Sequence, residues 1–164
     1  MNQLFDKYLQ NLPAGRIVWI GLRPERLQPM VVVEQAEAIA GLGLEGDRRC
    51  QGREGSARQV TLINQENIQA AAKVLGRDKI DPALLRRNLV VSGINLLALR
   101  GKRFRIGEVE LEGTAACHPC GRMEQALGAG GFAAMLGNGG LCAKILVGGE
   151  LRVGQSVELL PQNE

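Results

Sequence analysis

The sequence predicts a mainly β protein with a few helices, arranged as a β-barrel of mixed and antiparallel strands. Two observations favour this fold class. Short apolar runs follow one another closely, and many of the chain's 22 glycines lie between them, as in barrels whose strands are joined by tight turns. Helical segments are too few and too irregular for a doubly wound α/β fold. Because aromatic residues make up only 3% of the chain, its core is expected to be aliphatic.

Apolar and β-branched residues cluster, or alternate with polar ones, in four segments that we predict as strands: 16–22, 30–39, 58–63 and 88–91. Pro24 and Pro29 mark the loop between the first two of these strands. A glycine-rich turn at 41–48 leads into residues 49–57, which we expect to form a mobile loop.

Three helical segments accompany these strands. Residues 2–12 are expected to form a short helix that is broken by the proline and glycine after it. Asn64 is a favourable N-cap for a helix whose apolar stripe ends before Gly76. Pro82 can open a single helical turn over residues 83–86.

The second half of the chain is more strongly β. Alternating apolar residues predict five further strands: 103–106, 109–113, 141–147, 151–153 and 157–160. Two short helices are expected at 123–127 and 132–136, with glycines between them. The chain has no internal repeat, low-complexity segment or linker, so it predicts a single domain over residues 1–164, with a core over about 15–160.

Charge and composition exclude several classes of protein. The formal net charge is only +3, and Lys and Arg are not interleaved with aromatic residues, so we expect no nucleic-acid partner. No apolar run approaches the roughly 18 residues of a membrane helix, so we expect no membrane partner. Residues 1–7 lack the apolar core of a signal peptide. We therefore expect a cytoplasmic protein with reduced thiols.

The segment Cys117-His118-Pro119-Cys120 is the strongest functional signal in the chain. It follows a predicted strand and precedes a predicted helix. Free N–H groups at a helix N-terminus stabilise a thiolate, as do nearby cations such as Arg122. This indicates a nucleophilic or metal-ligating cysteine, with Cys120 the more reactive of the two, although a pair of small buried thiols would give the same pattern. The ring of His118 could polarise a thiol or face water.

Three other kinds of site fit these residues less well. A structural zinc site needs four ligands, and Cys50 and Cys142 lie far from the motif in the sequence. A thioredoxin-like site for disulfide exchange would need a βαβ context early in the domain. The turn at 43–46 lacks the Gly-Lys-Ser/Thr ending of a phosphate-binding loop, so it fits a plain turn better.

Polar residues at the starts of two predicted strands indicate an anion site. Arg86 and Asn88 stand at the head of one strand, and Arg58 begins another. Planar guanidinium groups with several donors bind small anions well. Asp47 could orient one of these arginines or accept a proton. We expect four side chains to converge on Cys120 in one polar cleft: Arg58, Asp47, Arg86 and Asn88.

Six segments stand in the order found in one protein family: Gly-Leu-Glu-Gly-Asp-Arg (43–48), Arg-Gln-Val-Thr-Leu-Ile (58–63), Leu-Arg-Arg-Asn-Leu-Val-Val-Ser-Gly (85–93), Gly-Lys-Arg-Phe-Arg-Ile-Gly (101–107), Cys-His-Pro-Cys-Gly-Arg-Met-Glu (117–124) and Gly-Gly-Glu-Leu-Arg-Val-Gly (148–154). Through them the sequence resembles the MOSC family, named after the C-terminal domain of the molybdenum cofactor sulfurase. The resemblance implies a β-barrel with flanking helices, in agreement with the predicted strands.

The resemblance also implies a cofactor. The family's cysteine stands where Cys120 stands, and in the family's reductases it ligates molybdenum held by a pterin dithiolene. An Arg-x-Asn element that helps to hold the cofactor corresponds to Arg86 and Asn88, and Arg58 is a further candidate. The resemblance thus implies that Cys120 binds the metal of a molybdenum cofactor (molybdopterin), while the other three residues bind the rest of the cofactor.

Two functions follow from the resemblance. One is an oxidoreductase that acts on N-hydroxylated small molecules through molybdenum ligated by Cys120, with an electron-transfer protein as partner. The other is a sulfur carrier, in which a persulfide on Cys120 delivers sulfur from a donor protein to a cofactor or metal–sulfur cluster. Cys117 departs from family members that carry a single cysteine here. It could form a disulfide with Cys120 or relay sulfur to it.

Overall fold

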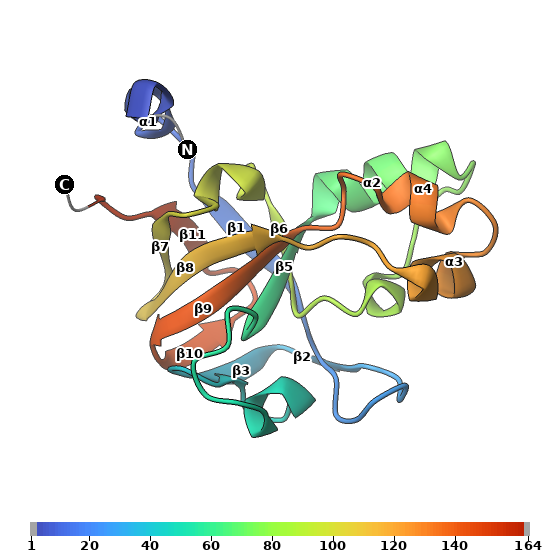
Figure 1. Cartoon of the computed structure of the whole chain (residues 1–164), viewed down its shortest axis with the longest axis horizontal. Helices are drawn as coiled ribbons and strands as arrows, with labels where there is room; N and C mark the ends of the chain where they lie inside the picture. Colours follow the sequence, from blue (N-terminus) through green and yellow to red (C-terminus); the bar gives the residue numbers. More distant parts are fainter. Residues whose placement is uncertain (1–2, 163–164) are drawn as a thin grey trace.

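A closed β-barrel forms the body of the protein, for which a computed structural model describes residues 3–162 (Figure 1). Within that range seven strands make the barrel: β1 (Gly15–Leu22), β5 (Val60–Asn64), β6 (Leu89–Ser92), β7 (Arg103–Ile106), β8 (Val109–Ala116), β9 (Leu141–Val147) and β11 (Ser156–Leu159). Their order is β11-β7-β8-β9-β5-β6-β1, and β11 closes the ring by pairing with β1. Neighbours are antiparallel except β5 and β6, which are parallel. The structure confirms the predicted mainly β barrel.

Four further strands lie outside the ring: β2 (Val31–Val33), β3 (Gln35–Ile39), β4 (Gly43–Leu44) and β10 (Gly149–Arg152). β2 pairs with the end of β1, whereas β3 pairs with β10 and β4 in a separate small sheet. The predicted continuous strand at 30–39 is therefore wrong, because the chain passes from one sheet to the other at Glu34. There the carbonyl of Glu34 accepts a hydrogen bond from the N–H of Val153 at 3.0 Å.

The described residues also form helices: α1 (Gln3–Leu9), α2 (Gln65–Val74), α3 (Gly121–Leu127), α4 (Gly131–Met135) and the 3₁₀ turns η1 (Arg48–Gln51), η2 (Pro82–Leu85) and η3 (Leu96–Leu99). Figure 1 shows α2, α3 and α4 together on one side of the barrel, whereas α1 lies apart from them, near both chain ends. No helix within residues 3–162 is long and apolar enough to cross a lipid bilayer.

The helices differ from the sequence prediction in three places. α1 is shorter than the predicted helix at 2–12, of which residue 2 lies outside the described range. The segment 49–57, predicted as a mobile loop, begins inside η1, where Asp47 accepts the N–H of Arg49 at 2.9 Å. The sequence does not predict η3, because a single turn is too short to give a periodic signal.

Asn64 lies at the N-cap of α2, as predicted, but its side chain bonds elsewhere. Its amide donates to the carbonyl of Ile94, and its Oδ1 accepts the N–H of Leu96 at 3.2 Å. This buried side chain therefore ties the start of α2 to η3. The helix ends where predicted, because Gly76 follows it with a φ of +66°, a conformation that favours glycine.

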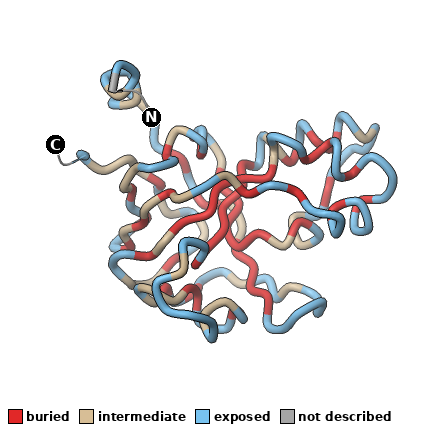
Figure 2. Tube along the Cα trace, viewed as in Figure 1, coloured by how far each residue is buried: buried red, intermediate tan, exposed pale blue. Residues whose placement is uncertain are grey.

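Two apolar clusters stabilise the fold (Figure 2). One fills the barrel and includes Phe104, which is fully buried. The other lies between the outer face of the barrel and helices α2, α3 and α4. β5 contributes Leu62 to the first cluster and Ile63 to the second, because successive side chains of a strand point to opposite faces.

Replacing Phe104 by alanine should lower the free energy of unfolding by about 3–5 kcal/mol, because it leaves a cavity inside the barrel. Phe132→Ala is the matched control, since the side chain of Phe132 is 40% exposed. Urea unfolding followed by circular dichroism measures both variants. A loss of less than about 1 kcal/mol for Phe104→Ala would contradict the packing described here.

Candidate functional site

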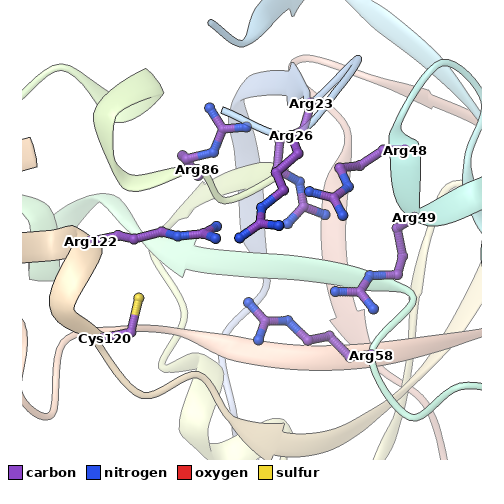
Figure 3. Close-up of a pocket in the computed structure, with 8 residues that line it drawn as sticks. All are labelled: Arg23, Arg26, Arg48, Arg49, Arg58, Arg86, Cys120 and Arg122. Carbon is purple, nitrogen blue, oxygen red and sulfur yellow. The ribbon is translucent and has the colours of Figure 1, made fainter. Parts of the chain in front are cut away.

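The pocket that contains Cys120 has a volume of about 360 Å³ and is otherwise lined by arginines (Figure 3). Its lining residues come from five separate segments: Arg23, Arg26, Arg48, Arg49, Arg58, Arg86, Cys120 and Arg122. These segments are the loop after β1, the turn η1, the approach to β5, the end of η2 and the start of α3. Figure 3 shows the guanidinium groups gathered around a common space, with the sulfur of Cys120 at its edge. The closed barrel brings these segments together.

A buried ion pair fixes one side of the pocket. Asp47, which is only 2% exposed, accepts hydrogen bonds from the Nε of Arg23 at 3.2 Å and from its Nη2 at 3.1 Å. It also accepts the backbone N–H of Arg23 at 2.9 Å. In return the carbonyl of Arg23 accepts the N–H of Arg48 at 2.7 Å. A two-pronged pair of this kind fixes the orientation of the guanidinium group as well as its position.

Asn88 supports this ion pair from behind. Its amide nitrogen donates to Asp47 Oδ2 at 2.8 Å and to the carbonyl of Gly21 at 3.1 Å. Its Oδ1 accepts the backbone N–H of Thr61 at 3.1 Å and the hydroxyl of Thr61 at 3.2 Å. Both ends of the amide are thus used within the protein, and the side chain is fully buried. Asn88 therefore positions Asp47, which in turn positions Arg23.

The side chain of Arg86 is hydrogen-bonded to the loop between β1 and β2. Its backbone lies in the left-handed region, with a φ of 56°, which is uncommon for a residue with a side chain. From there the guanidinium donates to the carbonyls of Gln28 at 2.6 Å and Glu25 at 3.4 Å. Burial lowers the pKa of Arg86, and the charges of Arg23 and Arg122 lower it further.

The pocket concentrates positive charge. Burial lowers the pKa of Arg49, and the neighbouring charges of Arg23, Arg58 and Arg48 add to this effect. Guanidinium groups nevertheless stay protonated at neutral pH. Cations held close together repel one another, and a bound anion relieves that repulsion. The site is therefore suited to a ligand that carries several negative charges.

The two cysteines of the motif face opposite ways. Burial alternates along the segment that joins β8 to α3, where Cys117 and Pro119 are buried while His118 and Cys120 are exposed. Cys120 lines the pocket at the N-cap of α3. Cys117 points into the protein, and its sulfur lies 2.8 Å from the sulfur of Cys142. Within residues 3–162, no group of three or more His, Cys, Asp or Glu side chains is placed to hold a metal ion.

Comparison with known proteins places this arrangement in a family. A family model for the MOSC domain matches residues 47–158, which is more than half of the chain. The chain belongs to the MOSC domain family. No curated protein matches the sequence of this MOSC domain.

Several crystal structures share the fold of this MOSC domain. The YUAD protein from Bacillus subtilis aligns with a TM-score of 0.76 and 18% identity, over 91% of this chain and 97% of that one. YiiM from Escherichia coli aligns with a TM-score of 0.67 and 19% identity, over 90% and 71% of the two chains. YiiM from Geobacillus stearothermophilus gives a TM-score of 0.69 and 15% identity, over 90% and 75%. At these identities the likeness concerns the fold.

Three of the site residues predicted from the sequence line the pocket of this MOSC domain: Arg58, Arg86 and Cys120. The other two residues expected in the cleft, Asp47 and Asn88, lie behind the pocket and bond to protein groups. Binding of a cofactor by the predicted residues stays a prediction.

Five further arginines line the pocket beyond the predicted site residues: Arg23, Arg26, Arg48, Arg49 and Arg122, of which the sequence indicated only Arg122, as a cation near Cys120. A sequence signal existed for Arg48 and Arg49, which follow Asp47 directly at the end of a glycine-rich turn. No local signal pointed to Arg23, because its place opposite Cys120 depends on the closure of the barrel.

Asp47→Asn should lower the free energy of unfolding at neutral pH by about 3–5 kcal/mol, because it leaves Arg23 buried without its counter-charge. Burial alone would raise the pKa of Asp47, but the hydrogen bonds and charge of Arg23 outweigh burial and hold it below the ordinary value of 3.8. The extra free energy of unfolding that the wild type has over Asp47→Asn should be fully present above pH 3.8, which is the pKa of Asp47 in the unfolded chain. It should shrink as the pH falls from there through the lower pKa of the folded state.

Urea unfolding of both proteins at neutral pH and near pH 3 measures this difference. The exposed Asp78 supplies a matched control, and Asp78→Asn should change stability little at either pH. A deficit of Asp47→Asn that is equally large at both pH values would contradict the assignment of a charged Asp47 to this ion pair.

Iodoacetamide should label Cys120 well before Cys117 and Cys142, because Cys120 is exposed whereas the other two are 4% and 6% exposed. Mass spectrometry of protein labelled for increasing times, in native buffer and in urea, gives the order of labelling. Cys120→Ser should remove the fast label from the peptide that contains both motif cysteines. Faster labelling of Cys117 than of Cys120 in native buffer would overturn the placement of the two thiols.

Proposed function

We propose that this MOSC domain binds a molybdenum cofactor through Cys120 and the surrounding arginines, and that it reduces N-hydroxylated compounds. The observation that carries the proposal is a single pocket in which one exposed thiol stands among seven arginines. The thiol suits a metal and the arginines suit the anionic group of the same ligand.

The arginines fit the organic part of such a cofactor. A pterin cofactor carries a phosphate, and guanidinium groups bind phosphate oxygens in pairs, with more geometric specificity than an ammonium group gives. Arg58 is well placed for this role. Its backbone N–H bonds to Ser56 Oγ at 3.2 Å, and its guanidinium group lines the pocket. Arg86, by contrast, also donates to two carbonyls of the loop after β1.

Cys120 fits the metal part. A thiolate is a soft ligand and suits a thiophilic metal. Cys120 is the thiol among the residues that line the pocket, so the protein would supply one sulfur and the dithiolene of the cofactor would supply others. When bound, the cofactor would supply two-electron redox chemistry at its metal.

The chain's own residues would hold and orient that group. Cys120 would fix the metal at the start of α3, while the arginines on the opposite segments would hold the phosphate. The links from Asn88 to Asp47 and from Asp47 to Arg23 would keep one of these arginines in a single orientation. Because Cys120 is exposed, the metal would stay open to a small substrate and to an electron-transfer protein.

A sulfur carrier is the second candidate. An exposed thiol beside cations is well suited to hold a persulfide, whose anionic form the arginines would stabilise. In this role Cys120 would accept sulfur from a donor protein and pass it to a cofactor or metal–sulfur cluster, and no metal would be needed on Cys120.

Arg58→Ala should weaken cofactor binding about 10- to 150-fold, since a hydrogen bond to a charged group contributes about 1.5–3 kcal/mol. Cys120→Ser should lose bound molybdenum and the reduction of an N-hydroxylated amidine, because serine is a harder ligand. Cys117→Ala should keep both. Protein produced in cells that make the cofactor is analysed for molybdenum, for pterin and for amidine formation.

Arg105→Ala is the matched control, because Arg105 is exposed on β7 and pairs with Glu158 away from the pocket. It should leave molybdenum content unchanged. Wild-type protein without molybdenum or pterin, but with cyanolysable sulfur that depends on Cys120, would reject the reductase and establish the carrier. Neither metal nor persulfide on Cys120 would reject both.

A further inference from the structure

A second pair of thiols lies inside the protein, away from the pocket-facing Cys120. The sulfurs of Cys117 and Cys142 are 2.8 Å apart, and the two side chains are 4% and 6% exposed. Cys117 directly follows β8, and Cys142 is the second residue of β9. The contact joins residues that are 25 positions apart in the sequence.

The backbone around this pair leaves little freedom. The N–H of Cys117 donates to the carbonyl of Gly140 at 2.8 Å, and Cys142 pairs with Ala115 across the two strands. A side chain at Gly139 would come within 1.9 Å of the carbonyl of Cys117, so only glycine allows the chains to approach so closely there. The two sulfurs are therefore held in contact by the fold itself.

Positive charge also faces the pair. The guanidinium of Arg87, which is 5% exposed, is fixed by hydrogen bonds to the carbonyls of Gly139 at 2.8 Å and Leu85 at 3.0 Å. The positive charges of Arg87 and of the pocket residue Arg58 favour the thiolate form of both cysteines, which works toward a lower pKa for each. Either thiol can donate to the other, and with Cys117 as the donor this hydrogen bond lowers the pKa of Cys142 despite burial, an effect to which the arginines add. Cys142 is thus the sulfur that attacks first.

We propose that Cys117 and Cys142 form a redox-active pair, which a small peroxide oxidises to a disulfide in which Cys120 takes no part. This inference does not depend on cofactor binding. It contrasts with the Cys117–Cys120 disulfide that the motif left open, because Cys117 faces Cys142 and Cys120 faces the pocket.

The reaction balances with hydrogen peroxide as the oxidant. The sulfur of Cys142 attacks one peroxide oxygen, the O–O bond breaks, and a sulfenic acid and one water are formed. The sulfur of Cys117 then attacks the sulfur of Cys142, the S–O bond breaks, and a second water leaves with the thiol proton. Two sulfurs are oxidised and the peroxide is reduced. A dithiol reductant returns two electrons and two protons and restores the thiols.

Peptide mapping of the whole wild-type chain tests the proposal directly. Trypsin places Cys117 and Cys120 in one peptide, residues 106–122, and Cys142 in the next, residues 123–144. The protein is treated with hydrogen peroxide, its free thiols are blocked with N-ethylmaleimide, and it is digested without reduction. We expect the two peptides to be joined in most molecules through Cys117 and Cys142, with Cys120 outside the disulfide, and to separate after dithiothreitol.

Three variants sharpen the assignment. Cys120→Ser and the matched control Cys50→Ser should form the linked peptides as the wild type does, whereas Cys142→Ser should not. A disulfide closed within peptide 106–122, or four blocked thiols at every peroxide concentration, would overturn the proposal. Should Cys142→Ser fail to fold, the maps of the wild type and of Cys120→Ser still decide, because linkage through Cys120 would disappear in the latter.

Discussion

The ion pair of Arg23 and Asp47 connects the turn η1 to the paired ends of β1 and β6, and the shape of the pocket depends on it. The carboxylate of Asp47 accepts the backbone N–H of Arg23 just after β1 and the N–H of Arg49 in η1. It also accepts a hydrogen bond from the side-chain amide of Asn88, just before β6. Breaking a buried pair by removing one partner is strongly destabilising, because the other charge is left uncompensated. Since η1 carries Arg48 and Arg49, the same contact also determines where these pocket cations stand.

A pocket of seven arginines opposes the stability of the fold that contains it. Two of these arginines have partners within the protein. Arg23 forms an ion pair with a carboxylate, and Arg86 donates hydrogen bonds to two backbone carbonyls. Burial is the main reason why the pKa values of Arg49 and Arg86 are lowered, and the charges of neighbouring arginines lower them further, so repulsion among the cations remains. A ligand that binds only the folded state stabilises it, so a polyanion would offset this repulsion. Function and stability are therefore linked at this site through charge.

Much of the fold could be predicted from the sequence because its signals are local. Alternation of apolar residues and glycine turns locate the strands, and their close spacing indicates a barrel. The break at Glu34 could not be predicted, since both halves of 30–39 have the composition of a strand and differ only in their pairing partners. The site divides in the same way. Arg58, Arg86 and Cys120 were predicted from their positions and line the pocket. The sequence cannot show whether a polar residue at the start of a strand, such as Asn88, binds a ligand or another side chain of the protein, and here Asn88 bonds to Asp47.

Whether the two motif cysteines lie on the same side of the chain depends on the conformation of the backbone between them. In a helix, residues three apart lie on one face, so a Cys-x-x-Cys segment would present both thiols together. Here burial alternates up to the N-cap of α3, so Cys117 and Cys120 point to opposite sides. The register of β8 with β9 then supplies Cys142 as the neighbour of Cys117. The two cysteines of the motif thus belong to different sites. Cys120 is an exposed thiol among cations and is suited to bind a ligand, whereas Cys117 belongs to a buried thiol pair that is suited to form a disulfide.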